Sequence, residues 1–434
     1  MPRFTLLLSK SHFPPRFGLG KSLSFRPRAL SSMDDYQKPP MRYAALDPLR
    51  GLAAVWVFLF HYSFTSTFQS TFPLLHTFLK AGDRGVPMFF VISGYCLAMA
   101  ASQSIQRDGS IGEFLYRRAK RIFPAFWCSI VVIVLLRWAT WSVARSCSII
   151  YDLPLMHDWK RWMMVVTLTP MFDQSDGTMY FLRMAHINCA YWTLPIEFQF
   201  YLVVSAALLA PRWFYPILAA VTLASMPVYF IATWNFRFAC EGVFLVYWLP
   251  FACGLALYWM LDRGVTPNMA FGRYAGSVST VGSIVLVSVF MVLTARKVEV
   301  ERLAFAVGLT TLLWLANPID GRVEEFLQRK RGVTGFLAKC LILLGAMSYS
   351  LYLIHNEAWY TIAFALRQFI PTGTSLSELT IDLSAVVGVF VICYPFYRCC
   401  EAPFVGGRKN RQRTPPAIPL HSSTAQDAPL AKAA

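Results

Sequence analysis

The feature that most constrains the fold is a series of apolar stretches, each about as long as a membrane-spanning helix. A helix needs about 20 mostly apolar residues to cross the hydrocarbon core of a bilayer. Ten stretches meet or approach this length, at residues 46–66, 84–102, 120–140, 191–210, 213–232, 243–261, 275–294, 303–317, 340–360 and 380–400. We therefore expect an all-α, polytopic membrane bundle of about ten transmembrane helices.

Charge is scarce and one-sided. Charged residues make up 15% of the chain, against about a quarter in ordinary soluble domains. The formal net charge of +17 would indicate nucleic-acid binding in a soluble protein, but membrane proteins concentrate Lys and Arg on the cytosolic side. With ten spans and a cytosolic N-terminus, most of the Lys and Arg residues fall in cytosolic segments. We expect both termini in the cytosol, an endomembrane or plasma-membrane location, and no nucleic-acid partner.

The two ends of the chain differ from its middle. Residues 1–42 are basic and contain no acid before Asp34, which predicts a disordered cytosolic tail; a mitochondrial transit peptide is the alternative. Residues 406–434 are polar and also predicted to be a disordered cytosolic tail. The membrane domain is therefore expected at 43–405.

Arg50 and His61 are ionisable residues inside the first predicted span, where such residues are costly and are functional candidates. They are about three helical turns apart, so both project from nearly the same face, about 16 Å apart along the axis. Arg50 is expected near the cytosolic mouth and His61 in the outer half. A functional pair is the preferred interpretation; for His61, a structural role is the alternative.

Glu197 is predicted about two turns from the outer surface, at a depth similar to that of His61. A carboxylate and an imidazole at one depth would suit an oriented general base. The alternative is a buried carboxylate satisfied by another helix. His355, near the outer end of its span, is expected to form a structural hydrogen bond rather than to act chemically.

Arg118 and Arg121 are three residues apart, so they share a helix face if a helix begins before them. Two guanidiniums at a membrane edge suit bidentate phosphate recognition, although a positive anchor or a lipid-headgroup contact explains the spacing equally simply. Phosphate-binding loops, zinc-protease motifs and nucleophile-elbow motifs are missing, and the ten cysteines lack metal-site spacing. We predict no metal site.

Taken in order, six segments resemble the acyltransferase 3 family of membrane O-acyltransferases. The segments are 46–61, with Arg-x10-His at Arg50 and His61; 85–95; 117–124, with Arg-x-x-Arg; 191–201, similar to a Trp-Ser-Leu-x-x-Glu segment; 345–355; and 401–404, with Glu-x-Pro. Thr193 and Pro195 depart from the fourth pattern. Because proline disrupts helix interiors, Pro195 is expected to kink this helix and move Glu197.

The resemblance implies transfer of an acyl group, acetyl by default, from acyl-CoA to a hydroxyl of a carbohydrate, small-molecule or secondary-metabolite acceptor. It implies His61 as general base, Glu197 as its orienting partner, and donor binding by Arg50, Arg118 and Arg121. His355 and Glu401 are further possible site residues. Acyl-CoA would be a co-substrate, with no tightly bound cofactor.

Two rival interpretations remain at this point. A transporter or flippase of a small polar or anionic molecule would also use intramembrane His, Arg and Glu residues. A catalytically silent scaffold with the same fold is the third interpretation.

Overall fold

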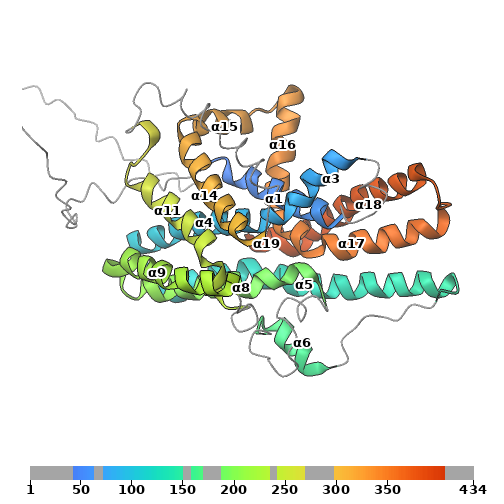
Figure 1. The fold of residues 1–434 in the computed structure, drawn as a ribbon, viewed down its shortest axis with the longest axis horizontal. Helices are drawn as coiled ribbons and strands as arrows, with labels where there is room; N and C mark the ends of the chain where they lie inside the picture. The colour runs from blue at the N-terminus through green and yellow to red at the C-terminus, as the bar shows by residue number, and fades with distance from the viewer. Residues whose placement is uncertain are drawn as a thin grey trace, which may run out of the picture. The chain divides into compact units, whose positions relative to one another are not determined.

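The computed structural model describes residues 43–62, 72–149, 158–169, 187–234, 242–268 and 298–405 (Figure 1). Every regular element within these ranges is a helix, which confirms the all-α prediction. The main helices are α1 (Leu46–Tyr62), α3 (Pro73–Lys80), α4 (Gly85–Gln106), α5 (Ile111–Ser146), α6 (Trp159–Val166), α8 (Thr193–Leu208), α9 (Phe214–Trp234), α11 (Phe244–Asp262), α14 (Val298–Ala316), α15 (Asp320–Leu327), α16 (Gly332–Ala346), α17 (Ser348–Phe369) and α18 (Ser375–Phe396).

Short elements join or end these helices. They are the 3-10 turns η2 (Ala81–Arg84), η4 (Cys189–Trp192), η5 (Pro211–Trp213) and η7 (Asn317–Ile319), the π-helical turn η8 (Tyr397–Glu401) and the final turn α19 (Ala402–Val405). The predicted span 275–294 and the predicted tails 1–42 and 406–434 lie outside the described residues.

Within the described residues, fewer candidate spans are found than the ten predicted for the whole chain. Five helical stretches are long and apolar enough to cross a membrane, or up to seven if each of two bent helix pairs is one span. The five are Pro73–Gln106, Ile111–Ser146, Phe244–Asp262, Arg302–Leu327 and Ser375–Val405. Among the described residues, the expectation of about ten helices is therefore not confirmed, although the multi-pass character is.

Much of the difference comes from a bend. The predicted spans 191–210 and 213–232 correspond to α8 and α9, which meet at 115°. Pro211 follows the bend, and a residue before proline is disfavoured in the α conformation. Ala210 accordingly has φ −127° and ψ 75°, which ends α8. A second bend of 76° separates α16 from α17, so the predicted span 340–360 straddles two helices.

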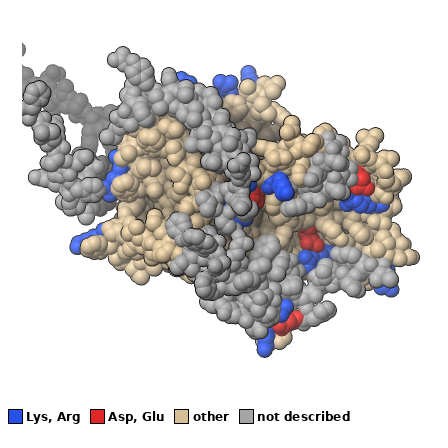
Figure 2. Space-filling model, in the orientation of Figure 1, with Lys and Arg blue, Asp and Glu red and all other residues tan. Residues whose placement is uncertain are grey.

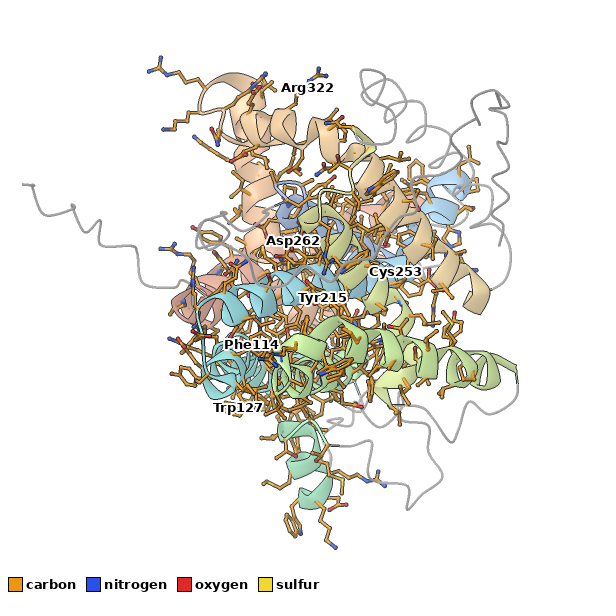
Figure 3. All side chains as sticks on the ribbon, turned by 90° about the vertical axis from the view of Figure 1, so that its left-hand side faces the viewer. Phe114, Trp127, Tyr215, Cys253, Asp262 and Arg322 are labelled. Atoms are coloured by element: carbon orange, nitrogen blue, oxygen red, sulfur yellow. The ribbon has the colours of Figure 1, made fainter. Side chains whose placement is uncertain are left out.

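α5 is the longest helix, at 36 residues or about 54 Å. It begins at a capping side chain, because the Ser110 hydroxyl accepts a hydrogen bond from the Glu113 amide at 3.1 Å. Val131, Leu135 and Trp138 repeat at helical spacing and are all exposed, as expected for a face in contact with lipid. The Trp127 indole N–H donates to the Val166 carbonyl of α6 at 3.1 Å (Figure 3).

Two helix contacts depend on glycine. A Cβ added at Gly94 of α4 would collide with the Phe251 carbonyl of α11, and one added at Gly254 would collide with the Val91 carbonyl. Gly51 of α1 and Gly345 of α16 meet in the same way. Small residues allow the backbones of membrane helices to approach closely, where van der Waals packing replaces the hydrophobic drive.

The visible described surface is mostly uncharged, with Lys and Arg in small separate groups (Figure 2). α17 packs against both α5 and α18, and Figure 1 shows the three helices running side by side. α17 also contacts α1, and α4 contacts α1 and α8. These five helices, α1, α4, α5, α8 and α17, carry the residues of the candidate site.

Candidate active site

Four predicted site residues line one cavity. Arg50 of α1, Arg118 and Arg121 of α5, and Glu197 of α8 all border a space of about 820 Å³, counted with its open mouth. We call it the arginine cavity. Its remaining walls are mainly apolar and aromatic residues of α4, α8 and α17. A mostly apolar pocket with a few converging polar groups is the usual form of a small-molecule site.

The guanidiniums of this cavity are placed by aromatic and acidic neighbours. The Cζ atom of Arg118 lies 5.7 Å from the Phe114 ring centroid and 6.0 Å from that of Tyr201, both cation–π distances. Arg50 pairs with Asp47 at 3.1 Å. In the described part of the chain, neither Arg118 nor Arg121 forms an ion pair with a carboxylate. Both therefore remain available to an anion.

Glu197 is held by hydroxyl groups. One of its carboxylate oxygens accepts hydrogen bonds from Ser93 at 3.1 Å and from Tyr201 at 2.5 Å. The predicted kink is wrong, because Pro195 lies in the first turn of α8, where its missing N–H has no helical partner to lose. Glu197 thus faces the arginines, and the hydroxyl partners occupy the position predicted for the His61 imidazole.

His61 lies at a second space, of about 640 Å³ counted with its open mouth, which we call the histidine cavity. Its walls are Phe58, His61, Tyr62, Asn356, Glu357, Trp359 and Tyr360, from α1 and α17. Aromatic rings predominate, with one amide and one carboxylate. The structure therefore places the two predicted catalytic residues, His61 and Glu197, on different cavities.

A chain of ring contacts connects the two cavities. Tyr352 lines the arginine cavity and its ring centroid lies 6.3 Å from that of His355. The His355 ring in turn lies 5.3 Å from the His61 ring, at 36°. The Tyr352 hydroxyl is fixed by the Ala190 carbonyl at 2.6 Å and by Thr193 at 2.7 Å. Two aromatic rings thus separate the guanidiniums from the imidazole of His61.

Glu401 occupies a supporting position. Its carboxylate accepts hydrogen bonds from the Ser350 amide at 3.0 Å and the Ser350 hydroxyl at 2.5 Å. Ser350 lies in the first turn of α17, where backbone N–H groups have no partner within the helix. Glu401 therefore caps the helix that carries Tyr352 and His355, and the π-helical turn η8 brings it there.

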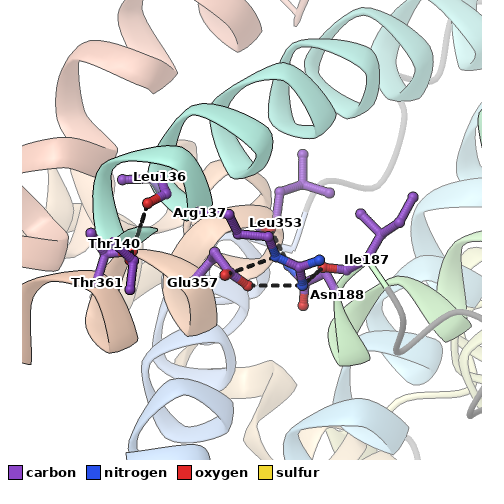
Figure 4. A network of polar contacts seen from close by, with 8 residues as sticks. All are labelled: Leu136, Arg137, Thr140, Ile187, Asn188, Leu353, Glu357 and Thr361. Carbon is purple, nitrogen blue, oxygen red and sulfur yellow. Dashed lines mark hydrogen bonds and ion pairs between the residues drawn. The ribbon is translucent and has the colours of Figure 1, made fainter. Parts of the chain in front are cut away.

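A largely buried ion pair beside the histidine cavity was not predicted from the sequence (Figure 4). Arg137 of α5 binds Glu357 of α17 through two nitrogens, at 2.9 and 3.3 Å. Its Nη2 also donates to the Ile187 carbonyl at 2.7 Å. Asn188 donates to the Leu353 carbonyl at 2.7 Å. Arg137 and Glu357 both fall inside predicted spans, so the criterion that selected Arg50 and His61 would have found them.

Comparison with known proteins gives several relatives of this chain, and three of them illustrate the range of similarity. The O-acetyl transferase of Shigella phage Sf6 is 33% identical over 37% of this chain and 44% of its own length. The peptidoglycan O-acetyltransferase OatA of Listeria monocytogenes is 25% identical over 84% of this chain and 56% of its own length. The exopolysaccharide production protein ExoZ of Rhizobium meliloti is 26% identical over 76% and 92%, respectively.

The extent of these matches differs. The chain spans about half the length of the phage protein and of OatA, and nearly all of ExoZ. No solved structure matches the chain. The acyltransferase domain that defines the acyltransferase 3 family matches residues 43–398, which hold both cavities. The chain therefore belongs to the acyltransferase 3 family.

Proposed function

We propose that this protein transfers an acyl group, acetyl by default, from acyl-CoA to a hydroxyl of a carbohydrate or small-molecule acceptor, including secondary metabolites. The observation that carries the proposal is the arginine cavity, which gathers Arg50, Arg118 and Arg121 from two helices around one space. The O-acetyltransferase names of two relatives support the same reaction type. No metal takes part in the reaction we propose.

The donor binds in the arginine cavity. Arg118 and Arg121 contact its phosphates, because guanidinium forks match phosphate oxygens and neither side chain is committed to a carboxylate in the described structure. Arg50 contributes from α1. The acyl-bearing thioester arm extends towards Tyr352, and movement of the Tyr352 side chain opens a route past the His355 ring to His61. Glu197 and Tyr201 form the polar wall that the donor meets beside Arg118.

His61 acts as the general base. A ring nitrogen of His61 takes the proton of the acceptor hydroxyl while the oxygen attacks the thioester carbonyl. The carbon–sulfur bond then breaks, the CoA thiolate leaves and takes the proton from the His61 imidazolium, which restores the base, and the acceptor keeps the acyl group as an ester. His61 suits this role because it borders the histidine cavity, where an acceptor can reach it.

The orientation in the membrane is part of the proposal. Both termini face the cytosol, in an endomembrane or the plasma membrane, so that acyl-CoA enters from the cytosolic side. The basic residues near the start of α5, Arg117, Arg118, Lys120 and Arg121, lie on that side under the positive-inside rule. Protease accessibility of terminal tags, in sealed membranes and after permeabilisation, tests this orientation.

The test of function compares membranes that carry the wild-type protein, His61→Ala or His76→Ala. His76 lies on α3 outside both cavities, so His76→Ala controls for the loss of a histidine. The membranes receive isotope-labelled acetyl-CoA and an extract of metabolites and polymers from the source cells. We expect label in one product with wild type and His76→Ala, and a loss of about 10²–10⁴ in rate with His61→Ala.

Two outcomes contradict the proposal. Equal labelling by His61→Ala removes His61 as the base. Movement of a substrate across sealed vesicles without consumption of any acyl-CoA, acetyl or longer, favours the transporter interpretation instead.

A further inference from the structure

His355 has a defined tautomer. Its Nδ1 atom lies 2.9 Å from the Leu351 carbonyl and 3.0 Å from the Tyr352 carbonyl, both on its own helix α17. Carbonyl oxygens only accept hydrogen bonds, so Nδ1 carries the hydrogen and Nε2 carries the lone pair. The sequence-based expectation of a structural hydrogen bond describes one side of this ring. The other side is a hydrogen-bond acceptor.

This acceptor is buried and has no partner. The His355 side chain is fully buried, and no described residue forms a hydrogen bond to its Nε2 atom. Buried polar atoms are nearly always paired, so an exception at a candidate site needs an explanation. Nε2 is on the side of the ring opposite the α17 backbone contacts, so its partner must be a side chain or a substrate group.

Among the described residues, three rings are in contact with the His355 ring, and only one of these three offers an N–H or O–H group that is not already engaged. The Phe58 ring, with its centroid 5.7 Å away, has no polar hydrogen. The Tyr352 hydroxyl is engaged by the Ala190 carbonyl and Thr193. His61 remains, with its ring centroid 5.3 Å from that of His355. At this separation a side-chain rotation brings facing ring nitrogens to hydrogen-bonding distance, about 2.7–3.2 Å.

We propose that His355 is a positioning residue for His61. Its Nε2 atom accepts a hydrogen bond from one N–H of the His61 imidazole, so that the other nitrogen of His61 presents its lone pair to the acceptor hydroxyl. When His61 takes the hydroxyl proton, this hydrogen bond persists and stabilises the imidazolium. The inference rests on the proposed role of His61, and it gives His355 the orienting task that the sequence analysis assigned to Glu197.

Burial decides which histidine performs which task. His61 is partly exposed and borders the histidine cavity, whereas His355 is fully enclosed and borders neither cavity. An acceptor therefore reaches His61 and not His355. Catalytic bases are commonly held in one tautomer by a third group behind them, and a neutral imidazole with a fixed lone pair can serve that purpose.

The test compares two substitutions that keep different ends of the ring. His355→Asn places an amide near the Nδ1 position, so the contact with the α17 carbonyls can persist, but nothing remains at the Nε2 position. His355→Gln places its amide near Nε2 and can accept a hydrogen bond there. We expect kcat to fall about tenfold or more in His355→Asn, to stay within about threefold of wild type in His355→Gln, and donor KM to change little in both.

A second readout needs no turnover. Diethylpyrocarbonate modifies the unprotonated nitrogen of accessible histidines, and mass spectrometry measures the rate at each site. In the wild-type protein we expect His61 to react and His355 to stay unmodified. The His61 rate should fall severalfold in His355→Asn and stay close to wild type in His355→Gln. This readout also separates the inference from the reaction, since a protein without acyl transfer still reports whether His355 orients His61.

Three results overturn the inference. One is equal kcat and equal His61 reactivity in wild type and His355→Asn. A second is a higher kcat in His355→Asn than in His355→Gln, because this order is expected if His355 acts only through its structural contact at Nδ1. The third, available even if neither variant folds, is faster modification of His355 than of His61 in the wild-type protein.

Discussion

The arginine cavity and the histidine cavity differ in how their charged groups are held. In the arginine cavity, Arg118 and Arg121 have no carboxylate partner among the described residues, and Glu197 is bound by hydroxyls. In the histidine cavity the carboxylate of Glu357 is already neutralised by Arg137. The guanidiniums of Arg118 and Arg121 can therefore bind a charged ligand in the arginine cavity. In the histidine cavity the carboxylate of Glu357 is instead used in an ion pair that joins α17 to α5.

This difference fits the two substrates that we propose. A CoA thioester carries several phosphate charges and needs uncommitted guanidiniums. A hydroxyl acceptor needs a base and a shaped apolar wall, which the rings of Phe58, Trp359 and Tyr360 supply. Glu357, although paired with Arg137, can still form part of this wall. The comparison therefore predicts that substitutions at the two cavities will produce different kinds of defect.

The largest effect is expected when the committed charge pair is broken. Glu357→Leu leaves the buried Arg137 guanidinium without its carboxylate, and loss of one partner of a buried pair typically costs about 3–5 kcal/mol. The double substitution Arg137→Leu with Glu357→Leu removes both charges and is expected to recover most of this loss. Chemical unfolding in detergent micelles measures the free energies of both proteins. Equal destabilisation of the single and double variants would show that the unpaired Arg137 guanidinium carries no cost of its own.

A smaller effect, on the donor alone, is expected at the uncommitted guanidinium. Arg118→Ala removes hydrogen bonds to a phosphate, each worth about 1.5–3 kcal/mol, so donor KM should rise roughly ten- to hundredfold with stability nearly unchanged. Arg117→Ala is the matched control, because Arg117 is exposed and pairs with Glu113 outside the cavity. Steady-state kinetics with varied acyl-CoA measure both. A donor KM that changes equally in the two variants would make Arg118 a general anchor.

The sequence could predict contacts between residues that are close together in the chain better than contacts between residues that are far apart. Arg118 and Arg121 lie on one helix face, and their spacing in the chain was enough to bring them together. The gathering of Arg50 and these two residues at one cavity was expected from a resemblance that covers several helices, whereas the place of Glu197 beside them was not. The helical character of most predicted spans was also a local property, since apolar composition over about 20 residues determines it.

Long-range contacts were beyond this reasoning. Arg137 and Glu357 are 220 residues apart in the chain. His61 lies on α1 and His355 on α17, so no rule based on sequence spacing connects either pair. The 115° bend between α8 and α9 falls at the break between two predicted spans, whereas the 76° bend between α16 and α17 was missed, because the single span predicted at 340–360 runs across it. Depth alone suggested that Glu197 would meet His61, but depth does not say which way two helices turn their faces.

The smallest effect tests whether the polar wall of the arginine cavity serves the donor. Tyr201→Phe keeps the ring beside Arg118 but removes the hydroxyl that donates to Glu197. One hydrogen bond to a charged group, partly compensated by Ser93, is worth about 1 kcal/mol, so donor KM should rise about fivefold or less. Tyr360→Phe is the matched control at the histidine cavity and should leave donor KM unchanged. A larger change in Tyr360→Phe than in Tyr201→Phe would contradict the division of tasks between the two cavities, because the acceptor side would then govern donor binding.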